Sequence, residues 1–206
     1  FAKVKFLTDI EMEVEGVIVV KIPRINSKEE YSEFCIKQLY KYFDTEYVMV
    51  VQHDGYVICG EAWNDCFLEY DYTAPKWTYT DGKNVGCGGA SLRSKVLQYI
   101  LGTDDFIFAS DPEDQAIGRL YRDYLIKKYD IKFATEDVAD MFGYELNAPY
   151  CKTFCFHGNF HHPFKEHIVL KRAASMGDVI MLEGVIDHYA KQGFQVVLDI
   201  LPEYMQ

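Results

Sequence analysis

The chain has 206 residues, of which 49% are hydrophobic and 26% are charged, and its formal net charge is −11. This composition indicates a globular protein with a substantial core and excludes an intrinsically disordered chain. Because an acidic surface repels phosphate backbones and anionic lipid heads, nucleic acid and membranes are not expected as main partners. No apolar run reaches transmembrane length, so no membrane span is expected.

Strand-like and helical runs alternate along the chain, which predicts an α/β layer fold. The front part is expected to hold two strands, then a helix that Ser27 and Glu30 begin as a capping box. A third strand is continuously apolar and is therefore expected at the centre of the sheet. These elements are predicted at Val4–Leu7, Val17–Ile22, Ser27–Phe43 and Tyr47–Gln52.

The rear part is expected to begin with a glycine-rich loop, followed by a helix that ends at Gly102 and a second that Asp111 caps, with Pro112 in its first position. A strand ending at His157, a last helix and an edge strand follow. The predicted bounds are Asp71–Gly89 for the loop, Ser91–Leu101 and Asp111–Tyr129 for the helices, Thr153–Phe156 for the strand, and Met176–Lys191 and Gln195–Leu198 for the last two elements. We find no linker and expect one domain, 1–206, with 159–206 as a helical C-terminal extension.

The six cysteines match no zinc or disulfide spacing, so they are expected to be reduced and mostly to pack in the interior. Reduced cysteines fit a cytoplasmic location. The chain starts at Phe1 without an initiator Met, and we expect residues upstream of it to be missing.

The first candidate site is the polar tetrad Gln52-His53-Asp54-Gly55, which follows the third strand directly. Ligands of open α/β sheets bind beyond the carboxyl ends of strands. A carboxylate there can hold a divalent ion that bridges a diphosphate. An ordinary Asp-Gly turn is the alternative.

The second candidate is His157, at the end of another apolar strand. It can supply a second metal ligand from far along the chain, opposite Asp54. The nearby histidines His161, His162 and His167 allow a zinc site, but their spacing is not a zinc motif. His161 and His162 are expected to face solvent, and a structural histidine is the alternative for His157.

The third candidate is the carboxylate pair Glu113 and Asp114, in the first turn of a predicted helix. An inverting sugar transfer needs a base that deprotonates the acceptor hydroxyl, and either residue can act as one. The alternative is structural, because acidic residues are favoured at helix N-termini.

The fourth candidate is the glycine-rich segment around Gly88 and Gly89, which is expected to enter a helix. Glycines let the backbone approach a ligand closely, and a helix N-terminus favours anions. Arg93 adds a cation for a phosphate or a sugar hydroxyl. Trp77, in the loop, is the aromatic residue expected to contact an acceptor sugar.

Taken together, these segments resemble one family of GT-A-type glycosyltransferases found in bacteria and large algal viruses. The chain is most similar to the chlorella-virus members that glycosylate a capsid protein. The matching strings cover Phe1 to Gly158 and are Gln52-His53-Asp54-Gly55-Tyr56, Glu61-Ala62-Trp63, Phe67-Leu68-Glu69-Tyr70-Asp71-Tyr72, Ala74-Pro75 with Trp77, Val85-Gly86, Gly88-Gly89, Ser91-Leu92-Arg93-Ser94, Glu113-Asp114 and Phe156-His157-Gly158.

The resemblance implies a GT-A-like, mostly parallel sheet, a UDP-sugar donor, Mn²⁺ or Mg²⁺, and a glycan or glycoprotein acceptor, in the host cytoplasm if the protein is viral. Asp54 and His157 would bind the ion, and Asp114, with Glu113 as the alternate, would be the base. Only one carboxylate stands where such folds carry Asp-x-Asp. The implied donor-binding residues are Thr8, Asp9, Gln52, His53, Gly55 and Arg93, and the implied acceptor-binding residues are Trp77, Gly88 and Gly89.

The stretch from Phe1 to Asp9 resembles the family's second strand, so the first βα unit would lie upstream. Two other function classes stay open. A metal-dependent nucleotide-sugar hydrolase or nucleotidyltransferase would bind the donor without needing an acceptor sugar. A non-catalytic carbohydrate-binding module would bind sugar independently of nucleotide and metal.

Overall fold

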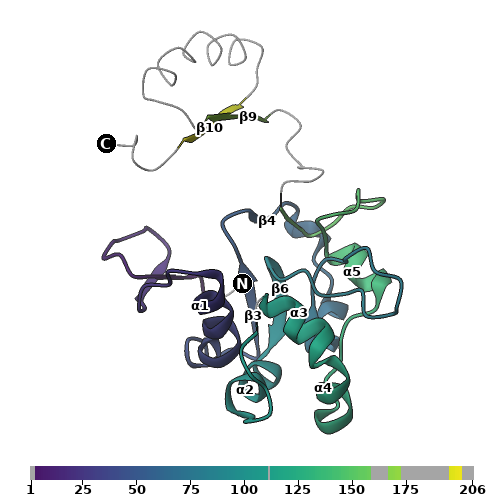
Figure 1. Cartoon of the computed structure of the whole chain (residues 1–206). Helices are drawn as coiled ribbons and strands as arrows, with labels where there is room; N and C mark the ends of the chain where they lie inside the picture. The colour runs from purple at the N-terminus through teal and green to yellow at the C-terminus, as the bar shows by residue number, and fades with distance from the viewer. Residues whose placement is uncertain (1–2, 111, 159–166, 173–194, 201–206) are drawn as a thin grey trace. The chain divides into compact units, whose positions relative to one another are not determined.

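The computed structural model describes residues 3–110, 112–158, 167–172 and 195–200 (Figure 1). The chain divides into two compact units, Phe1–His161 and His162–Gln206. In the second unit, strands β9 (His167–Arg172) and β10 (Gln195–Ile200) pair in parallel, and β10 confirms the strand predicted at Gln195–Leu198. The helix predicted at Met176–Lys191, the capping residue Asp111, and His161 and His162 lie outside the described residues.

The described residues of the first unit form three small sheets. One is the parallel pair of β1 (Lys5–Thr8) and β2 (Ile18–Lys21). The second is antiparallel, with β6 (Ala90–Ser94) between β3 (Tyr47–Val51) and β5 (Tyr72–Thr73). In the third, β8 (Cys155–His157) pairs antiparallel with β4 (Gly55–Val57) and parallel with β7 (Gly143–Tyr144).

These elements confirm the α/β class. Half of the strand pairs in the described part of the chain are antiparallel. The expectation that Tyr47–Gln52 is a central strand is wrong for the described sheet, because β3 lies at its edge. Its continuous apolar run is explained in part by Tyr47 and Met49, which pack against the core cluster built around Phe67.

The helical segments are short and several depart from α geometry. The predicted helix at Ser27–Phe43 begins as expected, since Ser27 Oγ accepts a hydrogen bond from the Glu30 N–H at 3.2 Å. It then widens into a π-helix and ends as a 3₁₀-helix. The predicted helix at Asp111–Tyr129 is likewise interrupted by a π-helix. The bounds are α1 Lys28–Glu33, η1 Phe34–Gln38, η2 Leu39–Lys41, η3 Gly60–Ala62, η4 Asp65–Glu69, α2 Lys95–Thr103, α3 Glu113–Gln115, η5 Ala116–Leu120, α4 Arg122–Tyr129 and α5 Glu136–Phe142.

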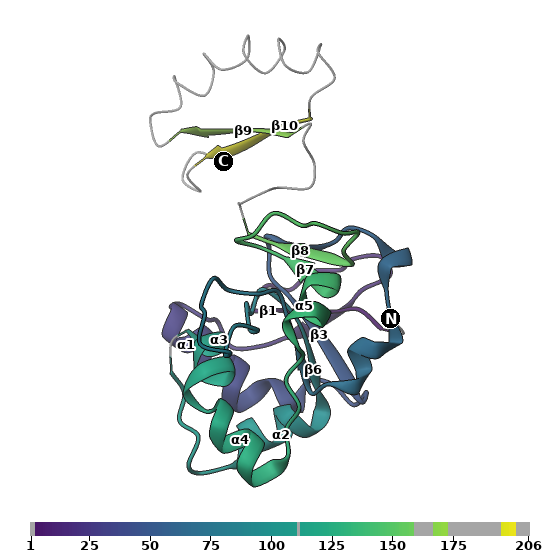
Figure 2. The ribbon, with the colours of Figure 1, turned by 90° about the vertical axis from the view of Figure 1, so that its right-hand side faces the viewer.

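The helix predicted from Ser91 starts at Lys95 instead, because Ser94 is its cap and its Oγ accepts from the Leu97 N–H at 3.0 Å. The preceding residues form β6, whose side chains alternate between two faces. Ala90 and Leu92 belong to the cluster around Phe67, whereas Arg93 lies over the Tyr72 ring on the other face. Helix α5, which follows the cap Thr135, was not predicted and lies against β7 (Figure 2).

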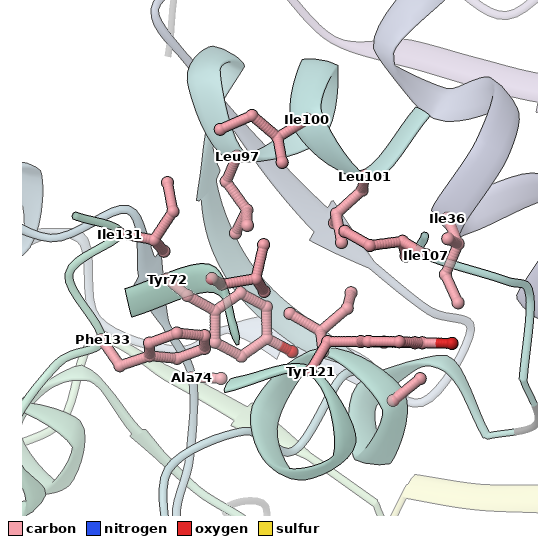
Figure 3. Packing of buried hydrophobic residues seen from close by; sticks show 13 residues of the cluster. Ile36, Tyr72, Ala74, Leu97, Ile100, Leu101, Ile107, Tyr121, Ile131 and Phe133 are labelled. Atoms are coloured by element: carbon pink, nitrogen blue, oxygen red, sulfur yellow. The ribbon is translucent and has the colours of Figure 1, made fainter. Parts of the chain in front are cut away.

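Two buried clusters therefore cover the two faces of the β3-β6-β5 sheet. The larger one gathers Tyr72, side chains of α2 and α4, and the π-helix η5 (Figure 3). The other joins β6 to η4, α5 and β8 through interlocking aromatic rings, such as Phe67 edge-on to Phe142 at 5.2 Å. In the part of the chain that the structure describes, no helix has the length and apolar character needed to cross a bilayer.

Candidate functional site

The tetrad Gln52–Gly55 forms a tight turn between β3 and β4. The Gly55 N–H donates to the Gln52 carbonyl at 3.0 Å, and the Gln52 N–H donates to the Gly89 carbonyl at 2.9 Å. The second bond extends the β3–β6 ladder by one step beyond Val51. The segment is therefore an ordinary turn, which is the alternative that the sequence left open. The turn holds Asp54, whose side chain is 27% exposed, between β3 and β4.

The third sheet brings two further side chains to Asp54. Its register places Gly55 opposite His157, and Tyr144 beside Phe156, so that Glu145, the residue after β7, lies at the same end of the sheet as His157, the last residue of β8. His157 Nε2 lies 3.3 Å from Asp54 Oδ1, and His157 Nδ1 lies 3.2 Å from Glu145 Oε2. The expected meeting of Asp54 and His157 is therefore observed, and Glu145 joins them.

The electrostatics of this group favour a positive charge between the carboxylates. Burial alone would lower the pKa of His157, but Glu145, Asp54 and Asp114 outweigh it and raise this pKa above its ordinary value. Burial likewise acts to raise the pKa of Glu145, yet His157 and the Cys87 thiol outweigh it and lower that pKa. Both ring nitrogens of His157 thus face carboxylate oxygens. In a neutral imidazole one nitrogen carries no proton, and the lone pair of that nitrogen would be repelled by the carboxylate beside it.

Asp54 and His157 are suitable ligands for a divalent cation. Asp54 Oδ1 and His157 Nδ1 are buried, and neither has a hydrogen bond of good geometry with any described residue. A cation between Asp54 Oδ1 and His157 Nε2 would satisfy the orphaned oxygen, and Glu145 would orient the imidazole from behind, as carboxylates commonly do in metal sites. Within the described ranges, no group of three or more His, Cys, Asp or Glu residues is arranged as a metal cage. These two ligands alone would therefore leave positions for a bound diphosphate or water.

Asp114 lies next to this group and is held by backbone N–H groups. Its Oδ2 accepts from Gly88 at 3.1 Å and its Oδ1 accepts from Gln115 at 2.7 Å. Burial, followed by the neighbouring Glu113 carboxylate, raises the pKa of Asp114 despite these two bonds. A carboxylate with a raised pKa is a stronger proton acceptor than an ordinary one.

Glu113 and Arg93 form a buried ion pair that lies away from solvent. Arg93 is 0% exposed, its Nη2 lies 3.2 Å from Glu113 Oε1, and its Nε donates to Ser91 Oγ at 2.9 Å. The expectation that Arg93 binds the donor is corrected by this burial, because the guanidinium is enclosed in the interior. Glu113 is equally enclosed, so the pair anchors the start of α3 and leaves Asp114 as the accessible carboxylate.

The glycines of the site allow close packing. A Cβ on Gly55 would lie 2.5 Å from the Gly89 carbonyl oxygen, a Cβ on Gly88 would lie 2.8 Å from the Asp114 Cβ, and a Cβ on Gly89 would overlap the His157 ring. Gly88 and Gly89 precede strand β6 and not a helix, so the expected anion site at a helix N-terminus is wrong. Their role in the described structure is to let the β6 entrance contact His157 and Asp114.

Trp77 is buried, which corrects the expectation that it offers its ring to a sugar. It is 6% exposed, and its ring fills the space above Gly86 and Gly118, where a Cβ would collide with it. Trp63 packs edge-on against Phe67 and Phe154.

The remaining predicted donor residues are more dispersed. Thr8 Oγ1 accepts from the Ile10 N–H at 3.1 Å, and Asp9 lies 4.0 Å from Arg24, both at the end of β1. Gln52 Nε2 donates to the Tyr31 hydroxyl at 2.9 Å. His53 is 92% exposed and its Nδ1 lies 3.8 Å from Asp54 Oδ1. The contacts described here link His53 to the Asp54 group but do not link Thr8 or Asp9 to it.

Glu145 is the residue of this site that the sequence did not reveal. The strand before it, Gly143–Tyr144, has only two residues and follows an unpredicted helix. The available signal was a carboxylate directly after a short apolar pair, which is the pattern that singled out Asp54, but a two-residue strand is too short to recognise by periodicity.

Comparison with known proteins gives one match. The family model described as "Protein of unknown function (DUF5672)" matches residues 16–164, which include all the side chains of the Asp54, His157, Glu145 and Asp114 group. No curated protein and no solved structure matches the chain. The matched range covers well over half of the sequence, and the chain belongs to the DUF5672 family.

Proposed function

We propose that this chain is the domain of a metal-dependent, GT-A-type glycosyltransferase that transfers a sugar from a UDP-sugar to a glycan or glycoprotein acceptor. The observation that carries the proposal is the 3.3 Å approach of Asp54 Oδ1 and His157 Nε2, with the Asp54 oxygen buried and lacking a hydrogen bond from the described residues. The mixed, mostly parallel GT-A sheet is part of the proposal, and the parallel pairs β1–β2 and β7–β8 are compatible with it.

Asp54 and His157 would hold Mn²⁺ or Mg²⁺. When bound, such an ion neutralises the donor's diphosphate and stabilises the leaving nucleotide. Because the described residues offer these two ligands and no larger cage, phosphate oxygens and water can occupy other positions around the ion. Glu145 keeps the imidazole turned toward Asp54, which fixes the ligand geometry before the donor arrives.

Asp114 would take the proton from the acceptor hydroxyl. Its raised pKa suits a base, and the N–H groups of Gly88 and Gln115 hold its two oxygens in place. Attack by the deprotonated oxygen on the face opposite the leaving nucleotide would invert the anomeric centre. Glu113 is less suited to this role because the buried Arg93 occupies its carboxylate.

The proposal is tested by calorimetric titration of the full chain with UDP, GDP and CMP, each with and without Mn²⁺. We expect tight binding of UDP that requires Mn²⁺. Asp54→Asn should abolish the Mn²⁺-dependent binding of UDP, while the melting temperature of the variant stays that of the wild type. Asp44→Asn, at an exposed position, is the matched control and should bind as the wild type does. Failure of the wild type to bind any of the three nucleotides with Mn²⁺ contradicts the proposal.

A further inference from the structure

Tyr79 is an exposed aromatic residue whose ring is held in place on several sides. It is 44% exposed and lies in the loop between β5 and β6, where its N–H donates to Asn84 Oδ1 at 2.9 Å. The Arg119 guanidinium carbon lies 3.8 Å from the ring centroid, and the Trp77 ring meets it nearly edge-on at 5.8 Å. Gln115 Nε2 reaches the Tyr79 hydroxyl at 3.5 Å.

The groups behind the ring are themselves fixed. Arg119 makes a two-pronged pair with Asp81, at 3.2 and 2.6 Å, and donates to the Lys83 carbonyl at 2.8 Å. Trp77 is buried on Gly86 and Gly118. A stacked, bidentate arginine and a buried indole leave the tyrosine ring little freedom. The guanidinium lies over the ring, and the residue as a whole is still 44% exposed.

A series of contacts connects the proposed cation site to this ring. It passes from His157 to Gly89, then through Gly88 to Asp114, whose neighbour Gln115 reaches Tyr79. Asp114 thus belongs to a chain of contacts that has the proposed cation ligands at one end and the aromatic ring at the other. In a transfer reaction these three groups would serve the donor diphosphate, the base and the acceptor.

We propose that Tyr79 is the platform on which a pyranose ring of the acceptor stacks. The inference rests on the proposed function and names the residue that binds its second substrate. The C–H face of a pyranose is apolar, so covering an aromatic ring with it removes apolar surface from water and stabilises the complex. A ring that is already immobilised loses little conformational entropy on binding. The π-helix η5 carries Arg119, and irregular helical turns of this kind are frequent at functional sites.

The experiment uses the full chain saturated with UDP and Mn²⁺. The probes are methyl glucopyranosides, galactopyranosides, mannopyranosides and xylopyranosides in both anomeric forms, and their binding is measured by saturation-transfer NMR and calorimetry. We expect at least one glycoside to bind the wild type. Tyr79→Ala should weaken that binding about tenfold, the effect of losing one aromatic contact. Tyr79→Phe should bind as the wild type does, because it keeps the ring.

Two controls separate stacking from a structural effect. Tyr99→Ala removes another exposed tyrosine, on α2, and should leave glycoside binding unchanged. The affinity for UDP and Mn²⁺ should be the same in all these variants. Wild-type affinity for glycosides in Tyr79→Ala, or weakened UDP binding in that variant, would overturn the platform. Absence of glycoside binding to a wild type that binds UDP and Mn²⁺ would also overturn it while leaving the proposed function intact, whereas a wild type that binds no UDP overturns the function itself.

Discussion

His157 Nε2 lies 3.3 Å from Asp54 Oδ1, although the two residues are about a hundred positions apart in the sequence. The short strand β4 makes this possible, because it begins directly after Asp54 and pairs Gly55 with His157. The parallel pairing of β7 with β8 then adds Glu145 on the other side of the imidazole. The register of this sheet thus brings together the two proposed cation ligands and the carboxylate that faces one of them.

Glu145→Ala should weaken Mn²⁺ binding in the presence of UDP by about 10–100-fold, the usual effect of losing a carboxylate behind a ligating histidine. The reason is that the imidazole loses the 3.2 Å contact that holds its Nδ1. Glu145→Gln should retain more affinity because its amide oxygen can still face Nδ1. Mn²⁺ binding is measured by electron paramagnetic resonance. Glu69→Ala, at an exposed position, is the control, and equal Mn²⁺ affinity in Glu145→Ala and the control would exclude the orienting role.

Asp114→Asn should abolish sugar transfer and raise the melting temperature at pH 7. Because the folded protein raises the pKa of Asp114, its ionised form destabilises the fold above that raised pKa. This destabilisation disappears as the pH falls below the ordinary carboxyl pKa, where both states are protonated. The difference in melting temperature between the variant and the wild type should therefore shrink on acidification. Each kcal/mol of stability corresponds to roughly 2–4 °C in melting temperature for a chain of this length.

Thermal melts of wild type and Asp114→Asn between pH 7 and pH 4 check this sign. A variant that is less stable than the wild type at pH 7, or a difference that grows on acidification, would contradict the assignment of a raised pKa. Retained transfer in Asp114→Asn would remove it as the base.

Glu113→Ala should lower the free energy of unfolding by about 3–5 kcal/mol, because it leaves the buried Arg93 without its partner. Replacing both members, as in Arg93→Met with Glu113→Leu, should recover most of that loss, since the desolvation cost of the pair is removed with it. Urea unfolding of Arg93→Met, Glu113→Leu and the double variant gives the coupling free energy. Strictly additive effects would show that the two side chains do not interact.

Gly86→Ala should destabilise the fold by about 1–3 kcal/mol, the typical effect of adding a methyl group to a packed interior. Its Cβ would collide with the buried Trp77 ring. Gly60→Ala is the matched control, because a Cβ there meets no atom within 4 Å. Denaturation of both variants in parallel tests the packing role of Trp77, and equal stability of the two would contradict it.

The sequence predicted the parts of the fold that depend on local signals. Ser27 caps a helix as expected, and His157 ends a strand as expected. The sequence could not predict the start of β6, because the Ser91–Ser94 stretch, which ends in a helix cap, also fits a helical pattern. Strand and helix are distinguished here only by the two buried clusters that pack on opposite faces of the strand. The site shows the same limit: Asp54 and His157 were recognisable from the strands before them, whereas the burial of Arg93 and Trp77 depends on tertiary packing that periodicity does not report.

The absence of a side chain at Gly89 ties that position to His157. A methyl group there would occupy the space of the imidazole, so a chain with alanine at this point cannot keep the histidine in its present place. A second substitution at a surface position far from His157 should therefore not restore the function lost in Gly89→Ala. A smaller residue at 157 would relieve the collision and restore folding, but it would also remove the proposed cation ligand. Glycine at position 89 is thus the condition for histidine at position 157.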